Sequence, residues 1–166
     1  VGLSNYDGER LSKATEILEE LHCPFVINQN RYSIFDRTIE QNGLKETAVR
    51  LKKGIIAFSP LAQGILTDRY LKGIPEDSRI KTDGRFLNSS AITEETLAKI
   101  RGLSEIAMRR GQTLAQMALS WVLKDGDVTS VLIGASKPSQ ILDNIKATHN
   151  TSFTKEELEE IDKYSL

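Results

Sequence analysis

Four short runs of mostly apolar residues, each followed by a longer segment with helical periodicity, constrain the fold of this 166-residue chain more than any other feature. The runs are Val1–Ser4, Phe25–Gln29, Ile55–Phe58 and Thr129–Ile133. They have the length and composition of buried strands, and at least a dozen residues separate each run from the next. Consecutive strands with such connections are parallel, with right-handed crossovers. The sequence therefore predicts an α/β fold of four consecutive strand–helix units.

The connecting segments carry apolar residues at every third or fourth position, which is the pattern of amphipathic helices. Thr93 and Thr154 each precede a glutamate-containing first turn, as N-cap residues do. Polar stretches at 30–42 and 61–92 predict loops, and a loop as long as the second is usually functional. The expected helices span residues 9–21, 44–53, 93–110 and 113–123, and two more begin near Pro138 and after Thr154.

Composition and charge exclude several classes of function. Lysine and arginine (22) nearly balance aspartate and glutamate (23), so neither nucleic acid nor an anionic membrane is an expected partner. No apolar run approaches the roughly 20 residues of a membrane span. The single cysteine, Cys23, excludes a disulfide framework and predicts a cytoplasmic protein. His22 and His149 have no ligand-like spacing, so no metal site is predicted.

Polar side chains gather at the carboxyl ends of the expected strands. Ser4 and Asn5 lie at the end of the first run, and Gln29 ends the second. Ser59 and Ser136 follow the third and fourth runs. Ligands bind at this end of the strands both in (β/α)8 barrels and in open α/β sheets. No G-x-G-x-x-G motif follows the first run, so a Rossmann dinucleotide fold is not supported. The sequence predicts a ligand site at the carboxyl ends of a parallel sheet.

The turn Gly134–Ser136 joins the fourth run to a helix with Pro138 in its first turn. Backbone N–H groups and the positive end of the helix point into such a turn and favour an anion, and Lys137 adds a charge. A phosphate-bearing cofactor or substrate is one interpretation. An ordinary strand-to-helix connection explains the turn alone equally well.

Four motifs follow one another along the chain: Gly2-Leu-Ser-Asn5, Ile27-Asn-Gln-Asn-Arg-Tyr32, Ala57-Phe-Ser-Pro-Leu-Ala-Gln-Gly64, and Leu132-Ile-Gly-Ala-Ser136 with Gln140 and Asp143-Asn144 after it. Their order resembles the second half of an aldo-keto reductase, and the resemblance covers essentially the whole chain. The last two motifs resemble the branch that holds potassium-channel β subunits and bacterial L-glyceraldehyde 3-phosphate reductases. The resemblance implies half of a (β/α)8 TIM barrel, strands five to eight, plus a C-terminal helix. Residues 1–166 would be the C-terminal half-barrel, with the N-terminal half absent.

The resemblance also implies an NADP(H) site. Ser4, Asn5 and Gln29 match the side chains that hold the nicotinamide carboxamide, since hydroxyl and amide groups both donate and accept hydrogen bonds. Phe58 matches the aromatic residue that covers one face of the nicotinamide ring. The remaining matches are Ser59, Leu61 and Gly64 at the pyrophosphate, Arg69, Ser78 and Arg79 in the loop that closes over the cofactor, and Gly134, Ser136, Lys137, Gln140, Asp143 and Asn144 at the adenosine end with its 2′-phosphate.

Each match also has a purely structural explanation. Ser4 and Asn5 could cap the following helix, Gln29 could be a satisfied buried amide, and Phe58 could be core. Only their common place at strand ends, in family order, favours a cofactor site. Many aldo-keto reductases carry a lysine and an arginine where this chain has Ala135 and Gln140. NADPH is therefore expected over NADH by a reduced margin.

The family's catalytic Asp-Tyr-Lys-His tetrad comes from the first half of its barrel, and no motif here replaces it, so no catalytic residue is predicted. The resemblance implies a fragment of an NADPH-dependent oxidoreductase of small aldehydes or ketones, inactive by itself. A cofactor-sensing regulatory protein like the channel β subunits is one alternative. A non-catalytic half-barrel homodimer, which would hide the two sheet edges, is another.

Overall fold

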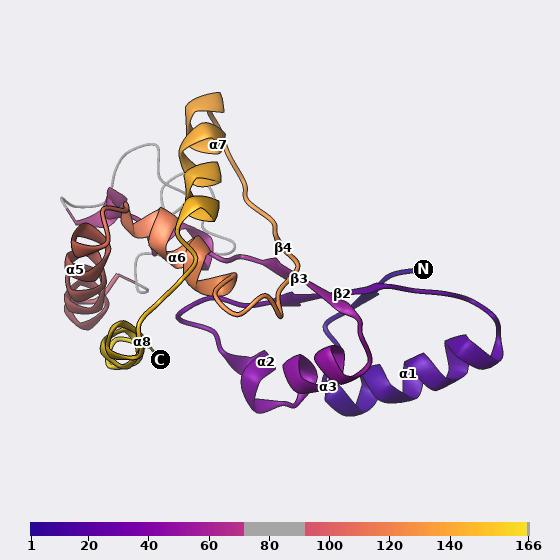
Figure 1. Ribbon diagram of the computed structural model, residues 1–166. Coiled ribbons are helices and arrows are strands. Elements are labelled where there is room, and N and C mark those ends of the chain that lie inside the picture. The colour runs from indigo at the N-terminus through magenta and orange to yellow at the C-terminus, as the bar shows by residue number, and fades with distance from the viewer. Residues whose placement is uncertain (72–91, 166) are drawn as a thin grey trace.

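A parallel sheet of four strands forms the centre of the computed structural model, which describes residues 1–71 and 92–165 (Figure 1). The strands are β1 (Leu3–Ser4), β2 (Ile27–Arg31), β3 (Gly54–Phe58) and β4 (Ser130–Val131). They lie side by side in chain order, and each neighbouring pair is parallel. The predicted α/β fold of four consecutive parallel strands is therefore confirmed.

The helices begin where local sequence signals place them. Thr93, Thr113 and Thr154 each accept a hydrogen bond from the backbone N–H three residues later, and the predicted caps at Thr93 and Thr154 are confirmed. The α-helices are α1 (Gly8–Glu20), α2 (Thr38–Gln41), α3 (Leu44–Arg50), α5 (Glu94–Arg109), α6 (Leu114–Val122), α7 (Pro138–Ile145) and α8 (Lys155–Asp162), and short 3-10 turns form η1 (Ala62–Gly64), η2 (Asp68–Tyr70) and η4 (Lys146–His149).

Several boundaries differ from those that the sequence predicts, and the ends of β2 and β4 bear most on the site. The polar stretch 30–42 is not all loop: Asn30 and Arg31 continue β2 by pairing with Ala57 and Phe58 of β3, and the stretch also contains α2. Hydrogen bonds between strands require only the backbone, so polar residues extend a strand whose neighbour is in register. Conversely, β4 ends at Val131 rather than Ile133, and the Leu132 N–H makes the last bond to β3 by donating to the Ala57 carbonyl at 2.8 Å.

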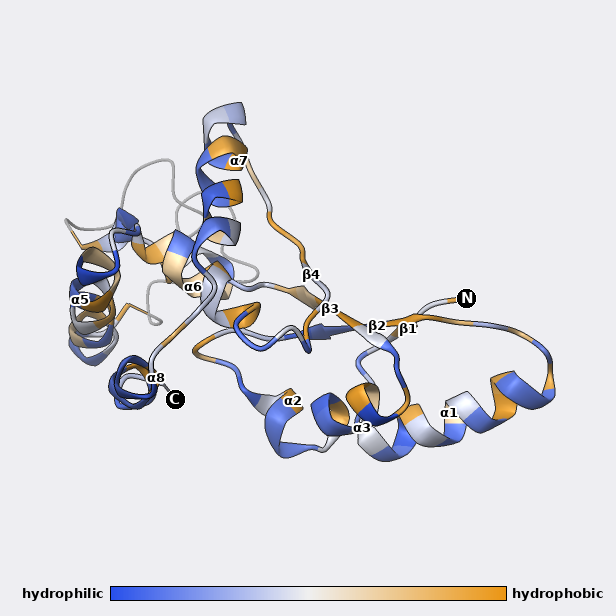
Figure 2. Cartoon of the chain, in the orientation of Figure 1, coloured by the Kyte–Doolittle hydropathy of each residue, from blue (hydrophilic) through white to orange (hydrophobic). Residues whose placement is uncertain are grey.

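The two faces of the sheet have different surroundings. Helices α1, α2 and α3 lie along one face, and Figure 2 shows these helices with both hydrophilic and hydrophobic residues. Side chains of β2 alternate in burial: Asn28 and Asn30 are buried on the helix-covered face, as are Ile55 and Ala57, their partners in β3. Paired residues of parallel strands point to the same side. The opposite face, here called the open face, therefore carries the row Ser4, Gln29, Ile56 and Ser130.

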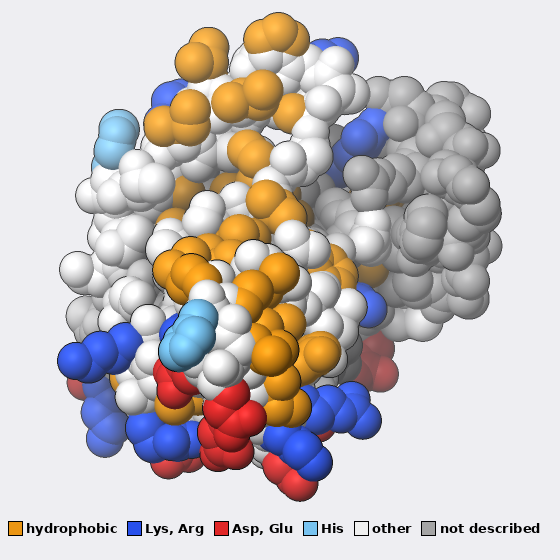
Figure 3. Space-filling view, turned by 90° about the vertical axis from the view of Figure 1, so that its right-hand side faces the viewer, with side chains coloured by type: hydrophobic (Ala, Val, Ile, Leu, Met, Phe, Trp, Pro, Cys, Tyr) orange, Lys and Arg blue, Asp and Glu red, His pale blue; other side chains and the backbone are white. Residues whose placement is uncertain are grey.

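Helix α7 has an exposed apolar side. None of its residues is buried, and Ile141, Leu142 and Ile145 are 45%, 67% and 52% exposed. Hydrophobic side chains crowd the top of the molecule in Figure 3, where α7 stands. The polar side of α7 contacts the rest of the chain instead. There the Gln116 amide of α6 donates to both the backbone carbonyl and the carboxylate of Asp143.

Candidate functional site

A cavity of about 1140 Å³ opens beyond the carboxyl ends of β3 and β4. One wall is the segment that follows β3 through η1 and η2, and the other is the turn before α7 together with α7 itself. The two walls lie about 70 residues apart in the sequence, and the sheet brings them together. Nine of the residues predicted for the cofactor site line this cavity: Ser59, Leu61, Gly64, Arg69, Gly134, Ser136, Gln140, Asp143 and Asn144.

The residues predicted for the nicotinamide end lie beside this cavity rather than in its wall. Ser4 and Gln29 are register partners, and the Ser4 hydroxyl and the Asn5 N–H both donate to the Gln29 carbonyl, at 3.1 and 2.9 Å. Phe58 pairs with Arg31, two residues beyond Gln29, and so shares the open face. Phe58 on the open face directly precedes Ser59 in the cavity wall. Gln29 lies inside β2 rather than at its carboxyl end, because the strand continues to Arg31.

Two structural explanations for these residues are wrong. Asp7, rather than Ser4 or Asn5, caps α1: its carboxylate accepts from the Arg10 N–H at 2.8 Å. The side-chain amides of Asn5 and Gln29 have no hydrogen-bond partner within residues 1–71 and 92–165. Gln29 is therefore not a satisfied buried amide, and both groups are free to bind a ligand.

Backbone strain marks the same strand ends. Asn5 follows β1 with a φ of 58°, and Ser59 follows β3 with a φ of 54°. Ala62 and Gln63, in the next turn, have φ values of 47° and 61°. Left-handed conformations at residues other than glycine cost of order 1–3 kcal/mol each and gather at ligand-binding sites. This signal is independent of the identity of the side chains, and sequence reasoning had no access to it.

The turn before α7, here called the anion turn (Gly134–Lys137), directs several donors at one point. The backbone N–H groups of Ser136 and Lys137 lie 2.8 and 3.2 Å from Oε1 of Gln140, and the Ser136 hydroxyl lies 3.3 Å from it. Gln140 thus holds the donors that an anion would use. Lys137 is the N-cap residue of α7 and does not line the cavity, so its predicted contact with a ligand is not supported by its position.

The cavity also contains residues that the sequence analysis missed. Lys146 lines the wall, and its ammonium lies 3.3 Å from the Asp143 carboxylate, which Gln116 contacts at 2.9 Å from the other side. Gln63 lines the opposite wall and donates to the Ser59 hydroxyl at 2.8 Å. The Thr113-to-Gln116 spacing of a capping box was the only sequence signal for Gln116. Ser78 and Arg79 lie outside the described residues, so their predicted roles stay predictions.

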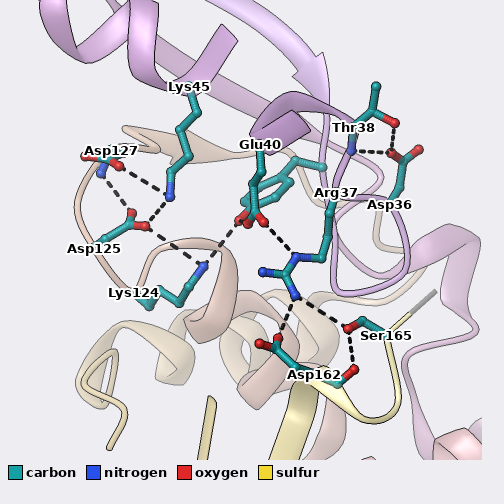
Figure 4. A network of polar contacts seen from close by, with 11 residues as sticks. Asp36, Arg37, Thr38, Glu40, Lys45, Lys124, Asp125, Asp127, Asp162 and Ser165 are labelled. Carbon is teal, nitrogen blue, oxygen red and sulfur yellow. Dashed lines mark hydrogen bonds and ion pairs between the residues drawn. The ribbon is translucent and has the colours of Figure 1, made fainter. Parts of the chain in front are cut away.

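The groups with the most shifted pKa values lie elsewhere, in the polar contacts around Trp121, here called the Trp121 network (Tyr32, Arg37, Glu40, Lys124 and Asp162; Figure 4). Burial lowers the pKa of Lys124 to about 8, and burial together with a hydrogen bond to Glu40 raises the pKa of Tyr32 far above its usual range. Tyr32 and Lys124 lie 3.2 Å apart, but Tyr32 is fully buried. A tyrosine that is inaccessible and hard to ionise is unsuited to acid catalysis, so this network is structural.

Comparison with known proteins agrees with a reductase-type half-barrel. The model of the Aldo/keto reductase family matches residues 1–165, so the chain belongs to that family. It is 47% identical, over 99% of its length, to the L-glyceraldehyde 3-phosphate reductases of Escherichia coli K12 and O157:H7, and covers 48% of each. It is 33% identical, over 88% of its length, to a probable voltage-gated potassium channel subunit beta of Oryza sativa subsp. japonica and covers 45% of it.

A solved thermostable aldo-keto reductase has the same fold over 98% of this chain, with a TM-score of 0.69 and 26% sequence identity, and 47% of that protein is covered. The chain thus spans about half the length of the relatives that it matches. Within the described ranges, no helix is long and apolar enough to cross a membrane, and no group of three His, Cys, Asp or Glu side chains could hold a metal ion.

Proposed function

We propose that this chain is the C-terminal, cofactor-binding half of an NADPH-dependent reductase of small aldehydes or ketones. In this proposal β1 to β4 are strands five to eight of a (β/α)8 barrel, and the rest of a longer protein supplies the first four. The observation that carries it is the cavity itself. Nine expected cofactor residues from two distant segments line it, and Ser59 in its wall directly follows Phe58 of the open face, which also carries Ser4 and Gln29.

The residues present fit an extended dinucleotide. The cavity is at the upper end of the roughly 300–1,000 Å³ typical of ligand sites, and its two walls meet the needs of a phosphate-rich ligand. Small residues and strained backbone after β3 would let N–H groups approach a pyrophosphate. The anion turn would bind a phosphate at the adenosine end, with Asp143 and Asn144 beside it.

The nicotinamide end would lie on the open face. The free amides of Asn5 and Gln29, with the Ser4 hydroxyl, would hold the carboxamide, and Phe58 would cover one ring face. Covering one face leaves only the other accessible to a carbonyl substrate, which determines the side of hydride transfer. The bound cofactor supplies the hydride, and a proton donor must come from outside this chain.

Cofactor titration tests the proposal directly. NADPH should bind to the protein that contains this chain and shift its fluorescence, and substitution of Gln29 by alanine should weaken that binding. Gln41→Ala, the same change at an exposed glutamine at the end of α2 and away from the cavity, is the control. Unchanged NADPH affinity in Gln29→Ala would remove the nicotinamide assignment, and the absence of NADPH binding would remove the whole proposal.

A regulatory role is the second candidate, because the probable channel β subunits share 33% identity with this chain. A sensor would bind the cofactor as tightly as a reductase but turn over carbonyl substrates slowly or not at all. Steady-state NADPH oxidation with several small aldehydes therefore distinguishes the two functions.

A further inference from the structure

Arg31 has a position on the open face that none of the functions considered above uses. It is the last residue of β2 and the register partner of Phe58. Alternation along β2 puts it on the same side as Gln29, opposite the buried Asn28 and Asn30. The backbone of Arg31 therefore lies one strand spacing, about 4.8 Å, from that of Phe58, the proposed nicotinamide-stacking residue.

Of the three guanidinium nitrogens of Arg31, only Nε has a partner among the described residues. Its Nε lies 3.1 Å from Oδ2 of Asp36, and the other oxygen of Asp36 accepts from the N–H and hydroxyl of Thr38, at 3.3 and 2.8 Å. Asp36 is therefore itself fixed and orients the guanidinium. Across residues 1–71 and 92–165, the two terminal nitrogens of Arg31 have no partner, and the side chain is 53% exposed.

Other guanidiniums of the chain are used within the fold. Arg37 contacts Glu40 and Asp162, at 2.7 and 2.6 Å, and Arg110 contacts Glu157 at 2.6 Å and the carbonyl of Ser152 at 2.9 Å. Arg10 of α1 is anchored in the same way, with its Nε 3.7 Å from Asp7. Arg31 differs in its position beside Phe58, where its anchored Nε leaves a planar pair of N–H-bearing nitrogens exposed. That geometry matches two oxygens of a phosphate or carboxylate.

We propose that Arg31 binds the phosphate group of a small phosphorylated aldehyde, whose carbonyl lies against the nicotinamide covered by Phe58. This inference rests on the proposed function and adds the substrate class to it. The substrate is anionic, and the same strand that holds the carboxamide through Gln29 also holds the substrate's phosphate through Arg31. Asp36 acts as a positioning residue, since it touches Arg31 rather than the substrate.

Paired substrates test the assignment in the complete protein that contains this chain. Glyceraldehyde 3-phosphate and glyceraldehyde differ only in the phosphate. Arg31→Ala should lower kcat/KM for the phosphorylated aldehyde roughly ten- to hundredfold, mainly through KM, because a charge-assisted hydrogen-bonded contact is lost. The value for glyceraldehyde should change by less than about twofold, and Arg31→Lys should retain part of the preference as a point charge.

Three measurements separate this role from others. NADPH affinity should be unchanged in Arg31→Ala, and Asp36→Asn should raise KM for the phosphorylated substrate less than Arg31→Ala does. Arg50→Ala is the matched control, since Arg50 is an exposed arginine of α3, on the helix-covered side, that contacts the Ser12 hydroxyl. It should leave both substrates unaffected.

Several outcomes would overturn the assignment. Equal losses for both aldehydes would mean that Arg31 only orders the site, and a parallel loss of NADPH affinity would mean that it contacts the cofactor. An unsubstituted protein that reduces glyceraldehyde without preferring its phosphate would overturn the role of Arg31 alone. A protein that binds NADPH but reduces neither aldehyde would overturn the reductase proposal as well.

Discussion

The cavity and the Trp121 network use polar groups in opposite ways. In the network, side chains satisfy one another: Glu40 accepts from Tyr32 and Arg37, Arg37 also contacts Asp162, and Lys124 donates to Tyr32 (Figure 4). In and beside the cavity, donors converge on a single amide oxygen or have no partner in the described chain, and the backbone is strained.

This difference shows which observation indicates function in this protein. The pKa shifts of Tyr32 and Lys124 belong to the buried network, where desolvation is the largest cause of each. The unpaired amides of Asn5 and Gln29 lie at the other region, where a ligand would complete their bonding. Four of the six positive φ values at described residues other than glycine also follow β1 or β3, and the other two are at His22 and Lys52. Here strain and unpaired amides, rather than perturbed titration, mark the candidate site.

The largest expected effect concerns catalysis by the isolated 166-residue chain. If Tyr32 and Lys124 do not form a catalytic pair, the chain alone lacks a proton donor. That loss removes on the order of 10²–10⁴ in rate through acid catalysis alone. NADPH absorbance in the presence of glyceraldehyde should show no enzymatic turnover. Turnover that Tyr32→Phe abolishes would instead make the network the active site.

The second-largest expected effect is on the free energy of unfolding, which should depend on the Trp121 network far more than on the cavity wall. Trp121 is fully buried, with the Tyr32 ring centroid at 5.3 Å and the Lys124 ammonium at 3.8 Å from its ring. Trp121→Ala should lower the free energy of unfolding by about 3–5 kcal/mol, whereas Ser136→Ala in the anion turn should change it by less than about 0.5 kcal/mol. Urea denaturation measures both. Comparable losses would show that the cavity wall supports the fold as strongly as the network does.

The network should also make stability depend on pH. Burial lowers the pKa of Lys124 from 10.5 to about 8, so the unfolded chain binds more protons than the folded chain between these values. The free energy of unfolding contributed by Lys124 therefore rises with pH in that window, by at most about 3 kcal/mol. Above pH 10 the raised pKa of Tyr32 acts in the opposite direction.

Denaturation at pH 7.5 and 9.5 tests this contribution before tyrosine ionises. The parent chain should be more stable at the higher pH, and Lys124→Met should lose that rise. Lys137→Met is the control, because Lys137 is an exposed lysine outside the network. The same rise in Lys124→Met as in the parent chain would assign the pH dependence to other groups.

The smallest expected effect concerns the anion turn. In Gln140→Glu a carboxylate would take the N–H groups of Ser136 and Lys137 and repel a phosphate. NADPH affinity should fall about tenfold, with a smaller loss for NADH, since a charged contact contributes about 1.5–3 kcal/mol. Fluorescence titration with both cofactors measures the difference. Equal losses would place the 2′-phosphate away from this turn.

Local patterns were sufficient to predict much of this fold. The apolar runs, the helical periodicity and the threonine caps all depend on residues within one turn or one strand of each other. The order of the strands followed because connections of this length require parallel neighbours. Of the cavity residues, Ser59 and Ser136 were predicted because they follow strand ends, and strand ends of a parallel sheet gather at one edge. The other predicted members came from the resemblance to aldo-keto reductases, and local patterns did not indicate Gln63 or Lys146.

What the sequence alone determined, then, is most of the helices and strands and the edge of the sheet at which the cavity opens. Tertiary structure decided how individual residues are used: that Arg31 belongs to β2 and faces the open side, that Gln140 occupies the donors of the anion turn, and that Asp36 orients Arg31. Register and side-chain pairing depend on groups that are distant in the sequence, and only the packed chain brings those groups within hydrogen-bonding distance.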